Sequence, residues 1–415
     1  MSTEIIDEVL AENKKNIKFA SFSFLGTALN YGSKFLLFIW LAKHIGFSSL
    51  GVISLVMSIV LLVEKLFNPQ IWLYLIKEKS ERIDFETLNT KCFFYELLFK
   101  FFATIFFYVF IFIFFNDSKS LYLLYGLYIP FSLIGTALGL IRINNDYYTV
   151  FLSNLTVFLT NSIVFVILFS FNIKSIFIIT LCILIVDLSY FLYLIIKSRV
   201  YRTFIKSINI NIFNFKELKL IFFFHINGAL RVLNRELDVV IVSIFFSSYI
   251  VGIYKLTKQI VHLPLFLTDG LYNAIYPSLC SFYNNDKIDS FKILLKKNVL
   301  LGGCVAFFSI FLVLILSYVL ENFYYDNSDG LFLSSIILIC PIVLAVVFFP
   351  LAPAINAMGE TKLLIVINLV SIIVYFALML SFSYMNEYYL MLLSYLAYYV
   401  IWTVLCLNLI RIKIK

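Results

Sequence analysis

The sequence predicts an all-α integral membrane protein with about twelve transmembrane helices in two six-helix lobes, related by a parallel pseudo-twofold repeat. Three observations carry this prediction. Of the 415 residues, 62% are hydrophobic and 13% are charged, which leaves too little polar surface for a water-soluble fold of this size. Twelve apolar runs are long enough to cross a hydrocarbon core of ~30 Å. Lys and Arg gather in alternate loops, as the positive-inside rule requires.

The apolar runs divide evenly between the two halves of the chain. In the first half they are Ile17 to Ala42, Leu50 to Ile76, Phe93 to Phe115, Leu121 to Ile141, Val150 to Phe171 and Ile176 to Ile196. In the second half they are Leu218 to Phe246, Val251 to Leu279, Val299 to Leu320, Leu331 to Ala357, Leu363 to Tyr384 and Tyr389 to Ile410. The predicted organisation is a cytoplasmic N-terminal segment 1–16, an N-lobe 17–197, a cytoplasmic linker 198–217, a C-lobe 218–410 and a basic tail 411–415.

The distribution of basic residues predicts the orientation. Twenty-two Lys and Arg fall in the termini and loops of one side, against Lys43, Lys119 and Lys174 on the other. The richer side is expected to be cytoplasmic, so both termini are placed in the cytoplasm. The first sixteen residues lack the apolar core and cleavage site of a secretory signal peptide. The first span is therefore expected to act as its own insertion signal.

A shift of 201 positions aligns the start of the second half with the start of the first. Under this shift Lys34 falls on Arg235 and Gly51 on Gly252, whereas the triplet 47–49 matches 246–248 at an offset of 199. A cation aligned with a cation inside a membrane helix, with Gly on Gly in the same register, favours an internal repeat over chance. Six spans per half give both copies one orientation, so the repeat axis is expected along the membrane normal.

Seven basic side chains lie inside predicted spans, where each costs about 2.5 to 3.5 kcal/mol at a helix centre. Charges retained there tend to face a wet cavity. For Lys100, four residues after Glu96, we expect an internal ion pair instead. The other six are the predicted substrate-binding cations: Lys34, Lys65, Arg231, Arg235, Lys255 and Lys258.

Helical periodicity gathers polar residues on narrow faces of the spans. One arc of the eighth span carries Lys255, Lys258, Gln259, His262, Asp269 and Asn273. One stripe of the seventh carries Asn227, Arg231, Asn234, Arg235 and Asp238. The first span adds Asn30 and Tyr31 beside Lys34. The predicted polar lining of the cavity therefore comprises Asn30, Tyr31, Asn227, Asn234, Gln259 and Asn273.

A wet chamber with surplus positive charge is expected to hold an anion, and guanidinium groups suit the oxygens of phosphate. We expect a phosphate or an acidic sugar. Five ionisable residues are candidates for binding a coupling H⁺ or Na⁺: Asp269, His262, Glu64, Asp187 and Asp238. Asp269 is the first choice. The alternative for each is an internal counter-ion, such as Glu64 for Lys65 or Asp238 for Arg235.

The sequence offers no sign of a cofactor or metal. The six cysteines lack CxxC pairs and ligand spacing, so neither a metal site nor a disulfide framework is expected. No GxxxxGK[ST] phosphate loop occurs, which disfavours ATP-driven transport within this polypeptide.

Three stretches resemble the polysaccharide transporters of the multidrug/oligosaccharidyl-lipid/polysaccharide exporter (MOP) superfamily. They are LAKHIGFSSLGVISL within 20–76, DVVIVSIFFSSYIVGIYKLTKQIV followed by YNAIYPSL within 238–279, and AINAMGETKLLIVINLVS at 354–371. Within that group the chain is most similar to O-antigen flippases of the Wzx type. The resemblance implies two six-helix lobes in a V shape that alternate between inward-open and outward-open states. It also implies a multi-pass protein of the bacterial inner membrane.

The cargo that this resemblance implies is an oligosaccharide unit on undecaprenyl pyrophosphate, moved from the cytoplasmic to the periplasmic leaflet during O-antigen or lipopolysaccharide biosynthesis. The implied partners are this lipid-linked substrate, the bilayer, and the polymerase and chain-length regulator of the pathway, with no nucleic acid. One alternative is a multidrug or small-molecule exporter of the same superfamily, in which an acidic cavity would be expected. A membrane polymerase or glycosyltransferase is a further alternative, but such enzymes generally need a large or acidic outer loop, and the outer loops here are short. We therefore expect a transporter rather than an enzyme.

Overall fold

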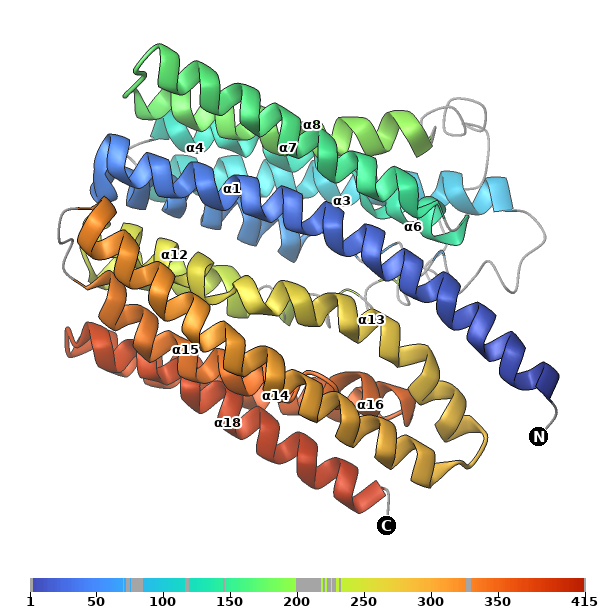
Figure 1. The fold of residues 1–415 in the computed structure, drawn as a ribbon. Helices are drawn as coiled ribbons and strands as arrows, with labels where there is room; N and C mark the ends of the chain where they lie inside the picture. The colour runs from blue at the N-terminus through green and yellow to red at the C-terminus, as the bar shows by residue number, and fades with distance from the viewer. Residues whose placement is uncertain are drawn as a thin grey trace. The chain divides into compact units, whose positions relative to one another are not determined.

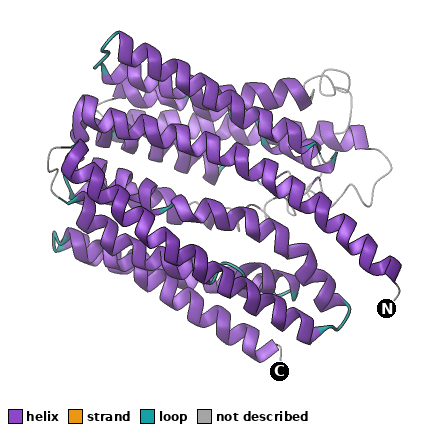
Figure 2. Ribbon diagram, viewed as in Figure 1, coloured by secondary structure: helices purple, strands orange, loops and turns teal. Residues whose placement is uncertain are grey.

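The structure is a computed structural model in which every described element is a helix (Figures 1 and 2). Side chains are described from residue 25 onward, except at some positions within helices. The described residues are 3–69, 71, 75, 85–115, 119–144, 146–198, 218, 221, 225, 229–230, 233–325 and 330–413.

The helices divide into two compact units. Unit 1 comprises Met1–Leu25 and Ile244–Lys415, and unit 2 comprises Gly26–Ser243. From the first half of the chain come α1 (Thr3–Leu66), α3 (Phe85–Phe114), α4 (Lys119–Gly126), α5 (Tyr128–Phe131), α6 (Gly135–Ile143), α7 (Tyr147–Ser170) and α8 (Ile176–Ser198). The π-helix η1 (Leu233–Leu237) and α11 (Asp238–Phe245) follow. The rest are α12 (Ser248–Val261), α13 (Leu263–Asn284), α14 (Ile288–Val319), η2 (Leu320–Tyr324), α15 (Leu331–Val347), α16 (Leu351–Ala357), α17 (Thr361–Tyr384) and α18 (Tyr388–Lys413).

Helix α1 holds the first two predicted spans, separated by a backbone break. At Gly46 the dihedral angles are φ 81° and ψ 159°, which are not helical. A positive φ of this size is accessible to glycine and strained for other residues. The sequence GFSSLG around this break therefore joins two helices rather than continuing one.

Two of the predicted spans are themselves interrupted by breaks in the helix. The fourth span is divided into α4–α5 and α6, which are bent by 40°. The eighth span is interrupted at His262, between the end of α12 at Val261 and the start of α13, which has Pro264 in its first turn. Proline suits a first turn because its missing N–H would have no helical partner there. Broken helices are tolerated at membrane depth where protein groups satisfy the freed backbone.

The described helices account for most of the predicted spans. Within the described ranges eight helices are long and apolar enough to cross a membrane, and nine if the bent pair counts as one span. One of these nine stretches, Leu25–Leu66, contains two predicted spans, so the nine correspond to ten predictions. The eighth span, which carries Lys255 and Lys258, is not among them. Most of the seventh, Leu218 to Phe246, lies outside the described residues.

The outer faces of several helices are apolar. On α14 the exposed side chains include Phe307, Phe308, Phe311 and Ile315, whereas Ser309 and Ser317 are buried and donate hydrogen bonds to carbonyl groups one turn earlier. A soluble helix would show the opposite distribution. Lipid chains solvate such faces directly, so the chain is a multi-pass membrane protein.

Inside unit 1, small residues permit close helix packing. A Cβ atom on Gly302 of α14 would lie 2.5 Å from the carbonyl oxygen of Val346 on α15. The next residue, Gly303, has nothing within 4 Å of its corresponding position. Gly302 therefore sets the distance between α14 and α15, and Gly303 does not.

Candidate functional site

The first group of buried charges lies in unit 2 around Glu64, which is fully buried near the end of α1. The ammonium group of Lys100 on α3 donates to Glu64 Oε1 and, at 2.7 Å, to the hydroxyl of Ser132. Asn68 Nδ2 donates to Glu64 Oε1 at 2.6 Å, and Lys65 Nζ lies 3.0 Å from Glu64 Oε2. Two cations and an amide thus surround one carboxylate, and the hydrogen bonds from Lys100 and Asn68 are made to its Oε1.

The predicted pairing of Lys100 with Glu96 is wrong, because Glu96 has another role. Its carboxylate accepts hydrogen bonds from the backbone N–H groups of Gly135 at 2.6 Å and Thr136 at 2.9 Å. These groups begin α6 after the break in the fourth span, where a carboxylate is favoured by the unsatisfied N–H groups and the helix dipole. Lys100 therefore forms its ion pair with Glu64.

A second pair in unit 2 joins α1 to α8. Lys34 Nζ lies 2.5 Å from Asp187 Oδ1, and the phenol of Tyr125 on α4 donates to Asp187 Oδ2 at 2.5 Å. Asp187 is buried, whereas the Lys34 side chain keeps 34% of its exposure. On the same helix as Lys34, Asn30 donates to Asn154 Oδ1 at 2.8 Å. Lys34 and Lys65, both predicted as cavity cations, therefore have carboxylate partners.

His225 lies against the C-terminal end of α1. Its Nε2 lies 2.6 Å from the carbonyl oxygen of Leu66, and its Nδ1 lies 3.2 Å from that of Asn68. Carbonyl groups at a helix end lack partners within the helix, so the imidazole ring occupies this end of α1.

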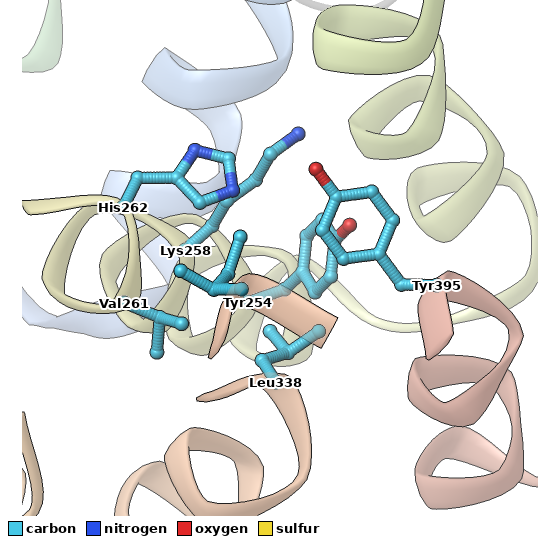
Figure 3. Close-up of a pocket in the computed structure, with 7 residues that line it drawn as sticks. Tyr254, Lys258, Val261, His262, Leu338 and Tyr395 are labelled. Carbon is cyan, nitrogen blue, oxygen red and sulfur yellow. The ribbon is translucent and has the colours of Figure 1, made fainter. Parts of the chain in front are cut away.

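The second group of charges lies in unit 1, in a pocket between α12, α15 and α18 (Figure 3). Its lining residues are Tyr254, Lys258, Val261, His262, Leu338, Ile342 and Tyr395. None of these described lining residues is acidic. Lys258 is 7% exposed, so its ammonium group is among the most deeply buried cations described.

Lys258 and His262 are placed in this pocket by the geometry of α12. They are four residues apart and therefore share a helix face. The backbone N–H of His262 donates to the carbonyl of Lys258 at 3.0 Å, which completes the last turn before the break. Cations near a helix C-terminus are stabilised by its dipole, so α12 ends in a position that favours both side chains.

Aromatic rings surround these two basic groups. Lys258 Nζ lies 5.8 Å from the ring centroid of Tyr254, within cation–π range. The ring of His262 stacks near Tyr395, with centroids 6.3 Å apart and an interplanar angle of 29°. In Figure 3 the hydroxyl groups of Tyr254 and Tyr395 point to the same side of the pocket as the Lys258 ammonium.

The remaining predicted residues are described only in part. Lys255 and Gln259 on α12 are half-buried, and Tyr31 on α1 is exposed. Asp238 is buried, with Oδ1 at 2.7 Å from the N–H of Val239. Asn227 and Arg231 lie outside the described residues, and nothing is described of the side chains at four further positions, Asn234, Arg235, Asp269 and Asn273.

No group of three or more His, Cys, Asp or Glu side chains that could hold a metal ion occurs within the described residues. The six cysteines are not bridged to one another.

Comparison with known proteins identifies the fold. No family model and no curated protein matches the sequence. A solved inward-facing multidrug resistance MATE family transporter of the MOP superfamily is similar over 96% of this chain and 98% of its own, with a TM-score of 0.68 and 12% identity. An outward-facing structure described in the same words covers 97% and 96%, with a TM-score of 0.61 and 9% identity. A Vibrio cholerae MATE transporter covers 96% and 97%, with a TM-score of 0.60 and 11% identity.

At these identities the likeness concerns the fold alone. It extends over nearly the whole of each chain, so no large domain is added or missing relative to these structures. The predicted fold class is confirmed: the described part of the chain is all-α, and the protein is a multi-pass membrane protein with a fold similar to that of solved MATE transporters.

Proposed function

We propose that this chain is a flippase that moves an undecaprenyl-pyrophosphate-linked oligosaccharide from the cytoplasmic to the periplasmic leaflet of a bacterial inner membrane. It would do so by alternating access through a cationic cavity and without enzymatic chemistry. The fold supports a transporter, because the solved structures that share it are transporters. The single observation that supports an anionic cargo is the burial of Lys258 in a pocket whose described lining has no carboxylate.

The cost of burying Lys258 supports this choice of cargo. A lysine at membrane depth costs about 2.5 to 3.5 kcal/mol, and such residues mark substrate or ion pathways. The 14 residues of α12 contain Lys255 and Lys258 but no Asp or Glu. A phosphate or carboxylate of the cargo is the kind of group that such a basic helix favours. Arg231 and Arg235 of the preceding span stay predicted cargo-binding cations.

The charged residues of unit 2 differ in whether they are accessible to the cargo. Lys34 and Lys65 remain candidates for contact with the cargo, because each side chain keeps about a third of its exposure. Lys100 does not, since its side chain is 2% exposed and donates to Glu64. Glu64 and Asp187 already have cationic partners, which makes either a poor first choice for binding an additional cation.

We propose Asp269 as the site that binds a coupling H⁺ or Na⁺, in line with its position seven residues after His262 on the same predicted face. Reconstituted Asp269→Asn protein should lose its dependence on an imposed ion gradient. Transport at the wild-type rate with the same gradient dependence would remove Asp269 from the proposal without affecting the cargo.

The main test replaces the pocket cation in cells whose only copy of the gene carries the change. We expect Lys258→Gln to reduce surface polysaccharide strongly and the Arg235→Gln/Lys258→Gln double variant to abolish it. Membrane levels of the protein, measured by immunoblot, should stay unchanged. The matched control is Lys362→Gln, because Lys362 is an exposed lysine of the same unit. Normal surface polysaccharide in the double variant would contradict the proposal.

A multidrug exporter is the second candidate, because solved structures with a similar fold are those of multidrug resistance transporters. The buried carboxylates Glu64 and Asp187 would then serve cationic drugs. Expression in a drug-sensitive host distinguishes the two. Increased tolerance to cationic dyes that depends on Glu64 or Asp187 would support the exporter, and unchanged tolerance would support the flippase.

A further inference from the structure

Three exposed lysines lie near the start of α14 in unit 1. Lys292, Lys296 and Lys297 form no ion pair within the residues that the structure describes. Lys413, at the end of α18 in the same unit, is instead paired with Glu360. Lys292 and Lys296 are four residues apart, and like charges at this spacing repel one another on a helix. The charge on this part of α14 is therefore unfavourable for the helix alone.

The packing of α14 determines the direction of these lysines. Phe291 is fully buried in an apolar cluster that includes Leu364 of α17 and Ile410 of α18. At about 100° per residue, the buried residues Asn298 and Ser309 lie within about 20° of Phe291 around the helix. The three lysines are about 100° to 140° away from Phe291 on the same scale. They therefore point away from the core of unit 1.

The same side of α14 is apolar and exposed further along the helix. Leu300, Phe307 and Phe311 are exposed and lie within about 60° of Lys296 around the helix axis. One continuous face thus changes from lysines to large apolar side chains along its length. Such a change is typical of a membrane interface, where lysine stems lie on apolar surface and their ammonium groups reach the headgroups.

The length of the apolar part gives the depth of the lysines. The 20 residues from Leu300 to Val319 carry no charge, and at about 1.5 Å per residue they cross a hydrocarbon core of about 30 Å. The lysines precede Leu300 by three, four and eight residues, so they lie about 5 to 12 Å beyond the core if the helix runs along the membrane normal. A headgroup layer is about 5 to 7 Å thick on each side. Lys296 and Lys297 therefore lie at the depth of the lipid phosphates, and Lys292 lies at the outer edge of that layer.

We propose that the basic face of α14, formed by Lys292, Lys296 and Lys297, binds an anionic phospholipid of the surrounding bilayer. The lipid phosphate would lie against the ammonium groups, and its acyl chains would lie along the apolar side chains that begin at Leu300. The only acidic residue of α14 is Asp289, so the three lysines keep a positive excess. Basic residues beside a span attract anionic lipids of the cytoplasmic leaflet, and this end of α14 is predicted to be cytoplasmic. The proposal does not depend on the cargo.

The test measures lipid binding to the purified full-length protein by mass spectrometry of the intact complexes, with phosphatidylglycerol and phosphatidylcholine as probes. The wild type should bind phosphatidylglycerol about tenfold more tightly, because each lysine near an anionic surface contributes about fivefold in affinity. The triple variant Lys292→Gln/Lys296→Gln/Lys297→Gln should lose most of this preference. Its melting temperature in detergent should stay unchanged, since all three side chains are exposed. An unchanged lipid preference in this variant would overturn the proposal.

A second triple variant distinguishes a defined site from general attraction to a basic surface. Lys362→Gln/Arg411→Gln/Lys413→Gln removes the same charge from exposed residues of α17 and α18, and it should keep the preference for phosphatidylglycerol. An equal loss in the two triple variants would show that any cations at this end of unit 1 suffice, and it would overturn the assignment to α14.

Replacing the three lysines of α14 by arginine keeps their charge and should keep the lipid preference. A loss of preference in the arginine variant as large as in the glutamine variant would exclude recognition by charge.

Competition with inorganic phosphate distinguishes a lipid from a soluble anion. A roughly tenfold excess of phosphate over lipid should leave phosphatidylglycerol bound, because the acyl chains along the apolar face add affinity that phosphate lacks. Displacement of the lipid at this excess would overturn the proposal. None of these measurements involves the cargo, so a negative result would leave the flippase proposal as it stands, and normal polysaccharide export in Lys258→Gln cells would leave the lipid site as it stands.

Discussion

The two units place buried lysines in contrasting surroundings. In unit 2 the ammonium group of Lys100 donates to Glu64, and that of Lys34 meets Asp187. In unit 1 Lys258 is also buried, and its pocket is lined by tyrosines, a histidine and aliphatic side chains. Ionisable groups inside a membrane either stabilise the fold or mark a substrate pathway. We propose that the lysine pairs of unit 2 mainly stabilise the fold and that Lys258 of unit 1 binds an anionic cargo.

The largest expected effect is in unit 2. Glu64→Gln leaves Lys100 buried without its carboxylate and should destabilise the protein by about 3 to 5 kcal/mol. The measurement is thermal unfolding of the purified protein in detergent.

The double variant Glu64→Gln/Lys100→Met is the control for this effect. A buried pair replaced by apolar or neutral groups of similar size is often tolerated, so the double variant should recover most of the lost stability. If both proteins melt at the same reduced temperature, the interaction of Glu64 with Lys100 is not what stabilises this region.

The next effect concerns Tyr125→Phe, which removes one hydrogen bond to a carboxylate. Asp187 then keeps Lys34 alone, and a lost charge-assisted hydrogen bond costs about 1.5 to 3 kcal/mol. Thermal unfolding in the same detergent measures this loss. Tyr148→Phe, at an exposed tyrosine of unit 2, should leave stability unchanged. An unchanged melting temperature for Tyr125→Phe would show that Lys34 alone satisfies Asp187.

Unit 1 should depend more on close packing than on ion pairs. Gly302→Ala places a methyl group 2.5 Å from the Val346 carbonyl oxygen, and overpacking of this kind costs about 1 to 3 kcal/mol. Gly303→Ala meets nothing within 4 Å and should be neutral or stabilising by up to about 1 kcal/mol, because alanine favours helix. Equal melting temperatures of the two variants would contradict the close contact of α14 with α15.

The smallest effect is expected at Lys34. Its side chain is one-third exposed, so water screens its pairing with Asp187 and the contribution to stability should stay below about 1 kcal/mol. Lys34→Gln should therefore change transport more than it changes the melting temperature. A loss as large as that of Glu64→Gln would mean that Lys34 is a structural residue like Lys100.

The fold was largely predictable because apolar runs and basic loops are strong local signals. Predicted spans such as Val150 to Phe171 and Leu363 to Tyr384 coincide with α7 and α17. The breaks were harder to predict. Proline bends helices, but only the backbone shows that α12 ends at Val261, three residues before Pro264. The break before Gly135 depends on Glu96, which lies 39 positions earlier.

The candidate site was predictable only in part, for a physical reason. Helical periodicity correctly placed Lys258 and His262 on one face. Periodicity reports which side of a helix a residue occupies, but not which residue of another helix it meets. Partners such as Asp187 for Lys34, 153 positions away, follow from tertiary packing. The tyrosines of the pocket were missed because aromatic residues occur throughout the spans.

The central claim is that the buried lysine of unit 1 serves the cargo and that of unit 2 serves the fold. Comparing Lys258→Met with Lys100→Met, for melting temperature in detergent and for surface polysaccharide in cells, tests it most directly. We predict that Lys258→Met loses export, and that it lowers the melting temperature much less than Lys100→Met does. Normal export by Lys258→Met, or a melting temperature lowered as much as in Lys100→Met, would contradict the claim.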